Sequence, residues 1–336
     1  EPYNFNLNNS TSKNIVSNSD KKISNNLEEN KNYINFKYNT LINSDIVIRN
    51  FKLVAGGKLY SAFIIYIDGM ADSKLINDFI LEPLMLRNSA NMHKSHCLKT
   101  KNQEKKVLVE KNSNNLASEI EQSLLPQNSL VKETDFSKVF NAVNMGNCVL
   151  FVDTLEVAFN LDVKGFKQRS VSSPNNEIVI KGPQEAFVES IRVNTSLLRR
   201  ATNTENLVIE NVSVGKLSNT ACSICYLKNI ANSDLVSEVR YRLNNLDIDT
   251  LVSAGQLEQL ICDNRKYNIP QLLSTERPDK AAKNLFGGRV VVLINGSSEI
   301  NIPLIALYFG IIAFISFILS DNTLPISSSL STLYAS

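Results

Sequence analysis

Two cysteines separated by two residues form a motif with chemical potential. The C-S-I-C motif from Cys222 to Cys225 has the spacing of a redox-active pair or of one half of a zinc site. A redox pair needs a helix N-terminus to lower the thiol pKa, and a zinc ribbon needs a second cysteine pair; the sequence offers neither. The motif lies in an apolar, strand-like segment, where residues three apart point to opposite faces. We therefore predict a structural role for both cysteines, with no disulfide and no bound metal.

A second set of possible ligands lies in a polar stretch. His93, His96 and Cys97 could supply three donors to a metal ion. The surrounding residues 87–106 are rich in lysine and contain no evident fourth ligand, so the composition of a loop explains the cluster better. These are the chain's only two histidines, which leaves little material for a histidine-based metal site or a catalytic triad.

Two carboxylates follow a predicted strand, where many α/β proteins have their sites. Asp68 and Asp72 could serve a metal-dependent hydrolase, but the duplicated copy of this segment described below has Lys228 and Asn232 instead. That exchange favours a turn and a helix cap over a general acid and base. The chain also lacks the GxxxxGK[ST], GxGxxG and GxSxG fingerprints. We therefore expect no catalytic residue, no cofactor and no enzymatic activity.

Composition narrows the class of protein. The 336 residues suggest two folded units with tails, and a hydrophobic content of 43% allows real cores. Lys and Arg number 35 against 33 Asp and Glu, a balance that argues against nucleic acid as a partner. Five irregularly spaced cysteines indicate a reducing compartment.

The sequence repeats itself. The alternating segments 45–51 and 206–212 each lead through a glycine-containing turn into a second strand, and the strands then run into YIDGMADSKLI and YLKNIANSDLV. Asp72 and Asn232 are predicted N-caps of helices over 73–86 and 233–243. Later, helices over 136–144 and 278–285 each precede a glycine and a buried strand, in GNCVLFVDT and GRVVVLING. The predicted fold class is α/β, with two related α/β subdomains joined by a helical connector.

The ends of the chain differ in character. The N-terminal region is rich in asparagine, serine and lysine and is predicted to be disordered. Near the other end, an uncharged apolar run is just long enough to be a transmembrane helix, although a buried helix or strand pair would also fit. Lysine and arginine precede this run and none follows it, so the positive-inside rule predicts that the folded part faces the cytoplasm. The predicted segments are a tail (1–40), a first subdomain (41–164), a connector (165–203), a second subdomain (204–300), a membrane segment (302–319) and a polar tail (320–336).

The connector carries a helix with a charged side. Pro183 suits the first helical position, and Phe187, Ile191, Leu197 and Leu198 would form an apolar face. The opposite side would hold Glu189, Arg192, Arg199 and Arg200. These charges form either a solvated face or, as we expect for the arginines, a contact with a neighbouring subdomain or subunit.

Four segments resemble a known family. They are FIIYIDGMADSKLINDFILEPLM from Phe63, GNCVLFVD from Gly146, KGFKQRSVSSPNNEIVIKGPQEAFVESIRVNTSLLRR from Lys164, and STERPDKAAKNLFGGRVVVLING from Ser274. In this order they resemble the A subunit of GerA-type spore germinant receptors. The residues that match the family pattern and could form an interface are Glu189, Arg192, Arg199, Arg200, Arg277 and Asp279.

The resemblance implies a receptor subunit and not an enzyme. It implies a membrane protein of the spore inner membrane that couples nutrient sensing to ion release, with its folded N-terminal region facing the spore core. The implied partners are a transporter-like B subunit, a lipoprotein C subunit and further copies of the A subunit in an ion-conducting oligomer. After Gly296 the family continues into several membrane helices, whereas this sequence has one apolar run and a Ser/Thr-rich tail. Two alternatives remain open, a small-ligand binding module with two α/β lobes and a metal-dependent hydrolase.

Overall fold

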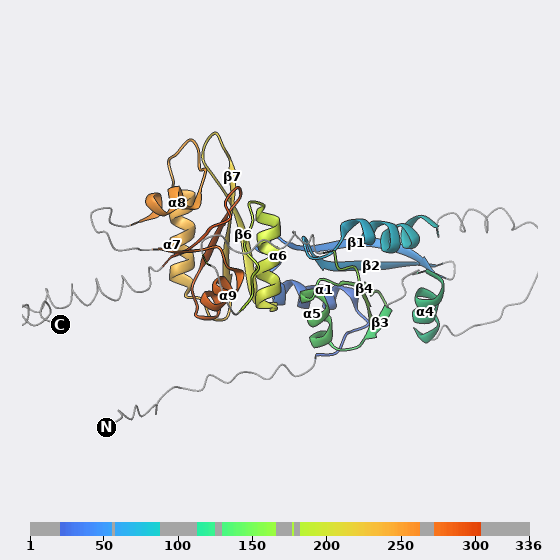
Figure 1. Ribbon diagram of the computed structural model, residues 1–336. Coiled ribbons are helices and arrows are strands. Elements are labelled where there is room, and N and C mark those ends of the chain that lie inside the picture. The colour runs from blue at the N-terminus through green and yellow to red at the C-terminus, as the bar shows by residue number, and fades with distance from the viewer. Residues whose placement is uncertain are drawn as a thin grey trace, which may run out of the picture. The chain divides into compact units, whose positions relative to one another are not determined.

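The chain forms two compact units, each built around one five-stranded sheet (Figure 1). A computed structural model describes residues 21–55, 58–87, 113–124, 130–165, 177, 182–262 and 272–303. The first unit contains the described parts of Glu1–Leu41, Asp45–Lys167 and Asn203–Glu205. The second contains the described parts of Ile42–Ser44, Gln168–Thr202 and Asn206–Ser336.

The first unit has the strand order β1-β2-β4-β5-β3, and every neighbouring pair is antiparallel. Its strands are β1 (Ile46–Ala55), β2 (Lys58–Ile67), β3 (Leu130–Glu133), β4 (Cys148–Val152) and β5 (Ala158–Leu161). Its helical segments are α1 (Leu27–Tyr38), α2 (Ser73–Ile76), the π-helical turns η1 (Asn77–Leu81) and η2 (Pro83–Arg87), α4 (Ser113–Glu119), η3 (Ile120–Leu124) and α5 (Phe136–Asn144).

The second unit repeats this topology strand for strand, in the antiparallel order β6-β7-β9-β10-β8. Its strands are β6 (Leu207–Val214), β7 (Thr220–Leu227), β8 (Leu272–Thr275), β9 (Val291–Ile294) and β10 (Ile300–Pro303), and its helices are α6 (Ile191–Thr202), α7 (Ser233–Asn244), α8 (Ala254–Ile261) and α9 (Pro278–Phe286). The identical order confirms the duplication predicted from the sequence. The α/β class is also confirmed, in the form of two antiparallel sheets.

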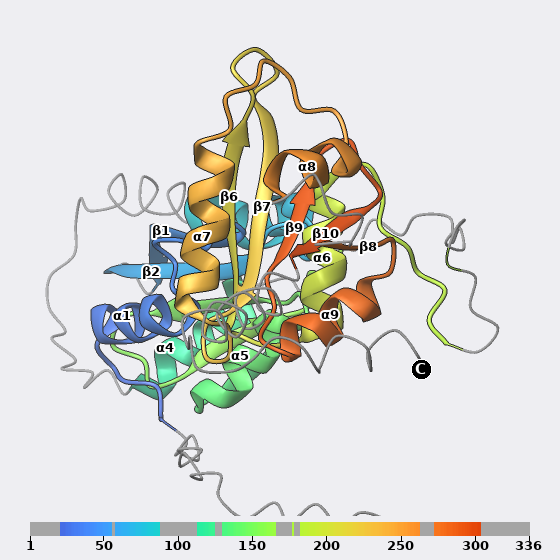
Figure 2. The same ribbon diagram turned by 90° about the vertical axis from the view of Figure 1, so that its left-hand side faces the viewer.

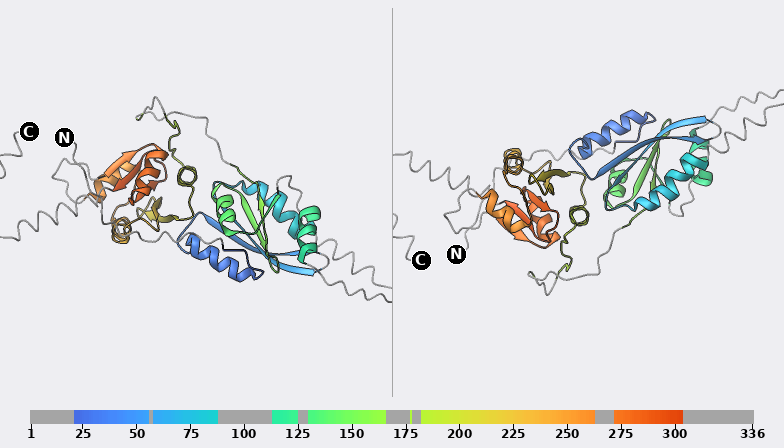
Figure 3. Two further views of the ribbon diagram at one scale, coloured as in Figure 1. Left: turned by 90° about the horizontal axis from the view of Figure 1, so that it is seen from below. Right: turned by 90° about the horizontal axis from the view of Figure 1, so that it is seen from above.

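Each sheet is covered by helices on both faces, so each unit has three layers and two cores. In the first unit, α1 lies on one side of the strands and the helical segment 73–87 on the other (Figure 3). In the second unit, residues of α7 and α8 form the core of one face, and residues of α6 and α9 form the core of the other. Figure 2 shows α7 in front of β6 and β7.

The repeat is longer than the sequence pattern indicated, because it begins with a helix. The expected disordered tail over 1–40 is wrong for Leu27–Tyr38, which form α1 and bury Ile34 and Tyr38 completely against the sheet. The helix of the expected connector, α6, is its counterpart, since both helices have 12 residues and directly precede the first strand of their sheet. Burial of one apolar stripe stabilises α1, although its asparagine-rich sequence has little helical signal of its own.

Matching polar contacts confirm that α1 and α6 are equivalent. Asn30, the fourth residue of α1, accepts from the Ser24 N–H at 2.9 Å and donates to the Ser24 carbonyl. Asn194, the fourth residue of α6, accepts from the Val188 N–H at 2.8 Å and donates to the Val188 carbonyl. Both asparagines are buried, and they fix the extended segment that enters each helix.

Most predicted helix boundaries agree with the structure. The Asp72 and Asn232 side chains accept from the Lys74 and Asp234 N–H groups at 2.8 Å, as expected of N-caps. The helix expected over 73–86 is helical but largely π-helical, because Pro83 has no N–H to continue the α-helical ladder. The helix of the connector starts at Ile191 and not at Pro183, because residues 182–190 form the extended segment that Asn194 fixes.

The C-terminal part of the second unit corrects the start of the predicted membrane segment. Ile302 and Pro303 belong to β10, which pairs with β8, and both are buried. Within the described residues, no helix is both long and apolar enough to cross a bilayer. Most of the segment 302–319 lies outside the described residues, as do His93, His96 and Cys97.

Candidate functional site

All six candidate interface residues lie in the second unit. Glu189 lies in the extended segment before α6, three arginines lie on α6, and Arg277 and Asp279 lie at the start of α9. Glu189, Arg192 and Arg200 are exposed, whereas Arg199 is only 1% exposed.

The sequence predicted that Arg199 lies on the polar face of the connector helix, and its burial shows that this prediction is wrong. Its Nη2 donates to Asn43 Oδ1 at 2.9 Å, and the same oxygen accepts from the Ile209 N–H at 2.9 Å. Asn43 Nδ2 donates to the Leu207 carbonyl at 3.0 Å, so residue 43 lines the free edge of β6. Thr195 and Thr202, one turn away on either side of Arg199, are also buried. The buried side of α6 includes the polar residues Thr195, Arg199 and Thr202. The spacing of hydrophobic residues in the sequence therefore could not predict which side of this helix is buried.

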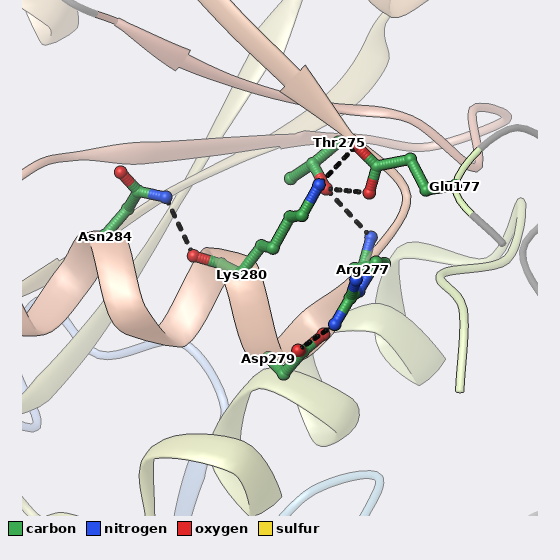
Figure 4. A network of polar contacts seen from close by, with 6 residues as sticks. All are labelled: Glu177, Thr275, Arg277, Asp279, Lys280 and Asn284. Atoms are coloured by element: carbon green, nitrogen blue, oxygen red, sulfur yellow. Dashed lines mark hydrogen bonds and ion pairs between the residues drawn. The ribbon is translucent and has the colours of Figure 1, made fainter. Parts of the chain in front are cut away.

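A polar network fixes the start of α9 (Figure 4). Glu177 accepts from the Thr275 hydroxyl at 2.9 Å and pairs with Lys280 Nζ at 2.9 Å. The Arg277 N–H in turn donates to Thr275 Oγ1 at 3.2 Å, and the Arg277 guanidinium forms a bidentate pair with Asp279. The network holds the extended residue 277 in place as the N-cap position of α9.

The Arg277–Asp279 pair changes the acid–base properties of both partners. Burial raises the pKa of Asp279, but the hydrogen bond and positive charge of Arg277 outweigh this effect and hold that pKa below its ordinary value. The hydrogen bond to Asp279 raises the pKa of Arg277. Both groups are therefore ionised at neutral pH, and Asp279 also lies where a helix N-terminus favours negative charge.

A groove of about 550 Å³ runs between α6 and α9. Two of the candidate residues, Arg200 and Asp279, line it, and Arg200 pairs with Glu185 at its rim. Phe286, at the end of α9, is 51% exposed beside the groove. Its lining residues are Pro183, Glu185, Leu197, Arg200, Ala201, Pro278, Asp279, Ala282, Lys283 and Phe286. The arrangement offers apolar contact surrounded by charges, which suits binding.

Asp72 and the cysteine pair serve the fold. The Asp72 side chain caps α2, and the backbone N–H of Asp68 bonds to the Asp45 carbonyl where β2 ends. Cys222 belongs to the core on the α7 side of its sheet and Cys225 to the core on the α6 side, which confirms that they face opposite ways. Burial raises the pKa of Cys222 to about 12, so its thiol is unreactive at neutral pH. Among the described residues, no group of three His, Cys, Asp or Glu side chains could hold a metal ion.

Sequence reasoning named Leu197, Arg200 and Asp279 but did not predict that they line one groove. Ala282 and Phe286 carry no motif, and these residues meet only because α6 and α9 pack side by side. One signal was available: an Asn-Thr pair ends both α1 and α6, at Asn39 and Asn203, and both asparagines adopt the left-handed conformation. That match would have identified the first helix of each repeat.

The fold is a duplicated three-layer α/β architecture, and its second unit carries a groove between α6 and α9. The sequence profile of the Bacillus/Clostridium GerA spore germination proteins matches residues 32–309. The chain belongs to this family, which confirms the resemblance found in the sequence.

Relatives and a solved structure agree with the family assignment. Spore germination protein KA of Bacillus subtilis (strain 168) is 29% identical over 267 residues, covering 80% of this chain and 45% of that protein. An uncharacterized membrane protein of the same organism, YfkQ, is 31% identical over 288 residues, covering 85% and 50%. The crystal structure of the N-terminal domain of the A subunit of the Bacillus megaterium spore germinant receptor GerK3 is similar at a TM-score of 0.60 and 29% identity, covering 85% of this chain and 97% of that one. The chain thus spans about half the length of the curated relatives it matches.

Proposed function

We propose that this chain is the N-terminal region of a germinant receptor A subunit, which couples nutrient sensing to ion release from the spore. The observation that carries the proposal is the similarity over almost the whole N-terminal domain of the GerK3 A subunit, together with the family match. In this proposal the region acts without catalysis, at the spore inner membrane and facing the spore core. Its partners are a transporter-like B subunit, a lipoprotein C subunit and further A subunits.

The exposed candidates supply the contacts in this proposal. Glu189, Arg192 and Arg200 are exposed on the second unit, where a partner subunit could contact them. Arg199 has a different role, since its buried guanidinium serves the fold through Asn43. Arg277 and Asp279 act indirectly, because their pairing shapes one end of the groove.

The test uses spores of the organism that carries the gene. Spores lacking it should lose ion release and the fall in optical density in response to at least one nutrient, and the restored gene should return both. An epitope on the restored protein should co-purify with a B-type and a C-type subunit from inner membranes. Deletion spores that respond normally to every nutrient, with the tagged protein absent from the membrane fraction, would refute the proposal.

A small-ligand binding module is the second candidate function. It is favoured by a cavity of about 610 Å³ in the first unit, a size typical of ligand sites. This cavity is lined by polar side chains that include Lys132, Thr134 and Glu156. Calorimetric titration with the nutrients that trigger the spores distinguishes the two, since heat of binding lost on Thr134→Val would favour a ligand site.

A further inference from the structure

The duplication shows what normally occupies the place of the α6–α9 groove. Helices α1 and α6 align residue by residue from Leu27 and Ile191, and α5 and α9 both have nine residues and precede a left-handed glycine. Each lining residue on these helices therefore has a counterpart in the first unit.

In the first unit, aromatic rings fill this place. The rings of Tyr33 and Phe136 meet edge to face with centroids 4.7 Å apart, and Phe140 lies 5.9 Å from Tyr33 and 5.7 Å from Phe136. Lys21 covers the cluster, with its Nζ 4.2 Å from the centre of the Tyr33 ring. The space between the two helices is thus closed by the protein's own side chains.

In the second unit, the same positions hold smaller residues. Leu197 replaces Tyr33, Pro278 replaces Phe136 and Ala282 replaces Phe140, and all three line the groove. At the end of the helix the exchange is reversed: the buried Asn144 of α5 corresponds to the half-exposed Phe286 of α9. The second unit therefore lacks the aromatic residues that fill this space in the first unit, and it exposes the ring of Phe286 beside the open groove.

The charges around the groove indicate which charged group would bind beside an aromatic ring in this space. Glu185 pairs with Arg200 and Asp279 pairs with Arg277, so these charges balance. Lys283 lines the groove and has no ion pair with any other residue in the described part of the chain. An incoming carboxylate would complete this set.

We propose that the α6–α9 groove is the docking site for a phenylalanine or tyrosine side chain on a segment of a partner protein, with an acidic residue next to that ring. Aromatic anchors in pockets provide much of the affinity of protein interfaces, and the first unit shows that this helix pair accommodates aromatic rings. A protein segment suits the site because it can bring an aromatic side chain and a neighbouring carboxylate together, to match the apolar lining and the charged side chains of the rim. This proposal goes beyond the proposed function and does not depend on it.

The test measures binding of the fluorescein-labelled peptide Glu-Phe-Glu, blocked at its C-terminus, to the full chain by fluorescence anisotropy. We expect millimolar or tighter binding, at least tenfold weaker binding of Glu-Ala-Glu, and preference for the acidic peptide over Lys-Phe-Lys. The decisive variant is Ala282→Phe, which places in the second unit the residue found at that position in the first. It should fill the groove and weaken binding of Glu-Phe-Glu at least tenfold, while the melting temperature stays within a few degrees. Lys283→Glu should abolish the preference for the acidic peptide.

Two controls keep the test decisive. Leu197→Tyr, the counterpart of Tyr33, replaces Ala282→Phe if the latter does not fold, and it should weaken binding similarly. Leu217→Phe adds a ring at an exposed site of the same unit that does not line the groove, and it should leave binding unchanged. Equal binding by the wild type and both filled variants, or no binding of Glu-Phe-Glu at millimolar concentration, overturns the proposal. Binding of N-acetylphenylalanine as tightly as the peptide would also overturn it, in favour of a small-molecule site.

Discussion

Thr154 is held in a backbone conformation that disfavours its side chain. Its φ is 72°, in the left-handed region, and the other three described non-glycine residues with positive φ are all asparagines. Asparagine tolerates this region, whereas a β-branched residue does not. The turn after β4 imposes the conformation, because the Thr154 N–H donates to the Asn25 carbonyl at 3.0 Å.

At the equivalent turn of the second unit, the residue in the left-handed conformation is a glycine. Gly296 follows β9 as Thr154 follows β4, has a φ of 92°, and donates its N–H to the Glu189 carbonyl at 2.7 Å. A Cβ added at Gly296 would meet no heavy atom within 4 Å, so a substitution there would change backbone energy and not packing. Exchanging the two residues therefore measures the conformational strain twice, in opposite directions.

The expected magnitude is a difference of two opposing effects. The left-handed conformation costs a residue with a Cβ about 1–2 kcal/mol, and glycine loses about 0.5–1 kcal/mol more conformational entropy on folding. Because the Thr154 side chain is exposed, it contributes little packing. Thr154→Gly should therefore stabilise the first unit by about 0.5–1 kcal/mol, and Gly296→Thr should destabilise the second unit by a similar amount.

Urea denaturation of the full chain, followed by far-UV circular dichroism, measures both changes. Thr154→Asn is the matched control, since it keeps a side chain but relieves part of the strain, and it should give an intermediate gain. The double variant should show additive changes, because the two turns lie in different units. A loss of about 0.5–1 kcal/mol for Thr154→Gly, the entropic effect alone, would refute the reasoning.

Three further predictions follow from the polar groups of the second unit. Asn194→Ala should destabilise it by about 2–4 kcal/mol in the same urea assay, because the buried N–H and carbonyl of Val188 both lose their partner; a loss below about 0.5 kcal/mol would contradict the assigned role. Arg199→Met should lower the free energy of unfolding by about 2–3 kcal/mol, whereas Arg192→Ala, at an exposed position, should lower it by no more than about 0.5 kcal/mol. Equal effects would contradict the distinction between buried and exposed arginines. Because the folded-state pKa of Asp279 is depressed, its stabilisation is present above the unfolded pKa of about 3.9 and is lost as the pH falls through the folded value. Stability measured from pH 6 to pH 2 should therefore fall less steeply for Asp279→Asn, and an unchanged slope would show that the pair has no effect.

Local signals in the sequence predicted much of the fold. Alternation predicted both hairpins, Asp72 and Asn232 were recognised as caps, and α5 was predicted with its observed limits, Phe136–Asn144. These features depend on residues close in sequence, so one sequence is enough to reveal them. Repetition of the pattern then gave two related units, and the family resemblance rested on the same segments.

The sequence by itself determined the duplication, the hairpin, two of the helices and the central strand of each repeat, and the family. Only the tertiary structure decided which helices complete the repeats, since α1 gains its stability from burying Ile34 and Tyr38 and not from helical propensity. It also decided that Arg199 is buried, because its partner Asn43 lies 156 residues away in the chain and is itself held by Leu207 and Ile209 of β6. The groove likewise exists only through packing: small residues at positions 278 and 282 leave space solely because α6 lies beside α9, a relation that no local pattern encodes.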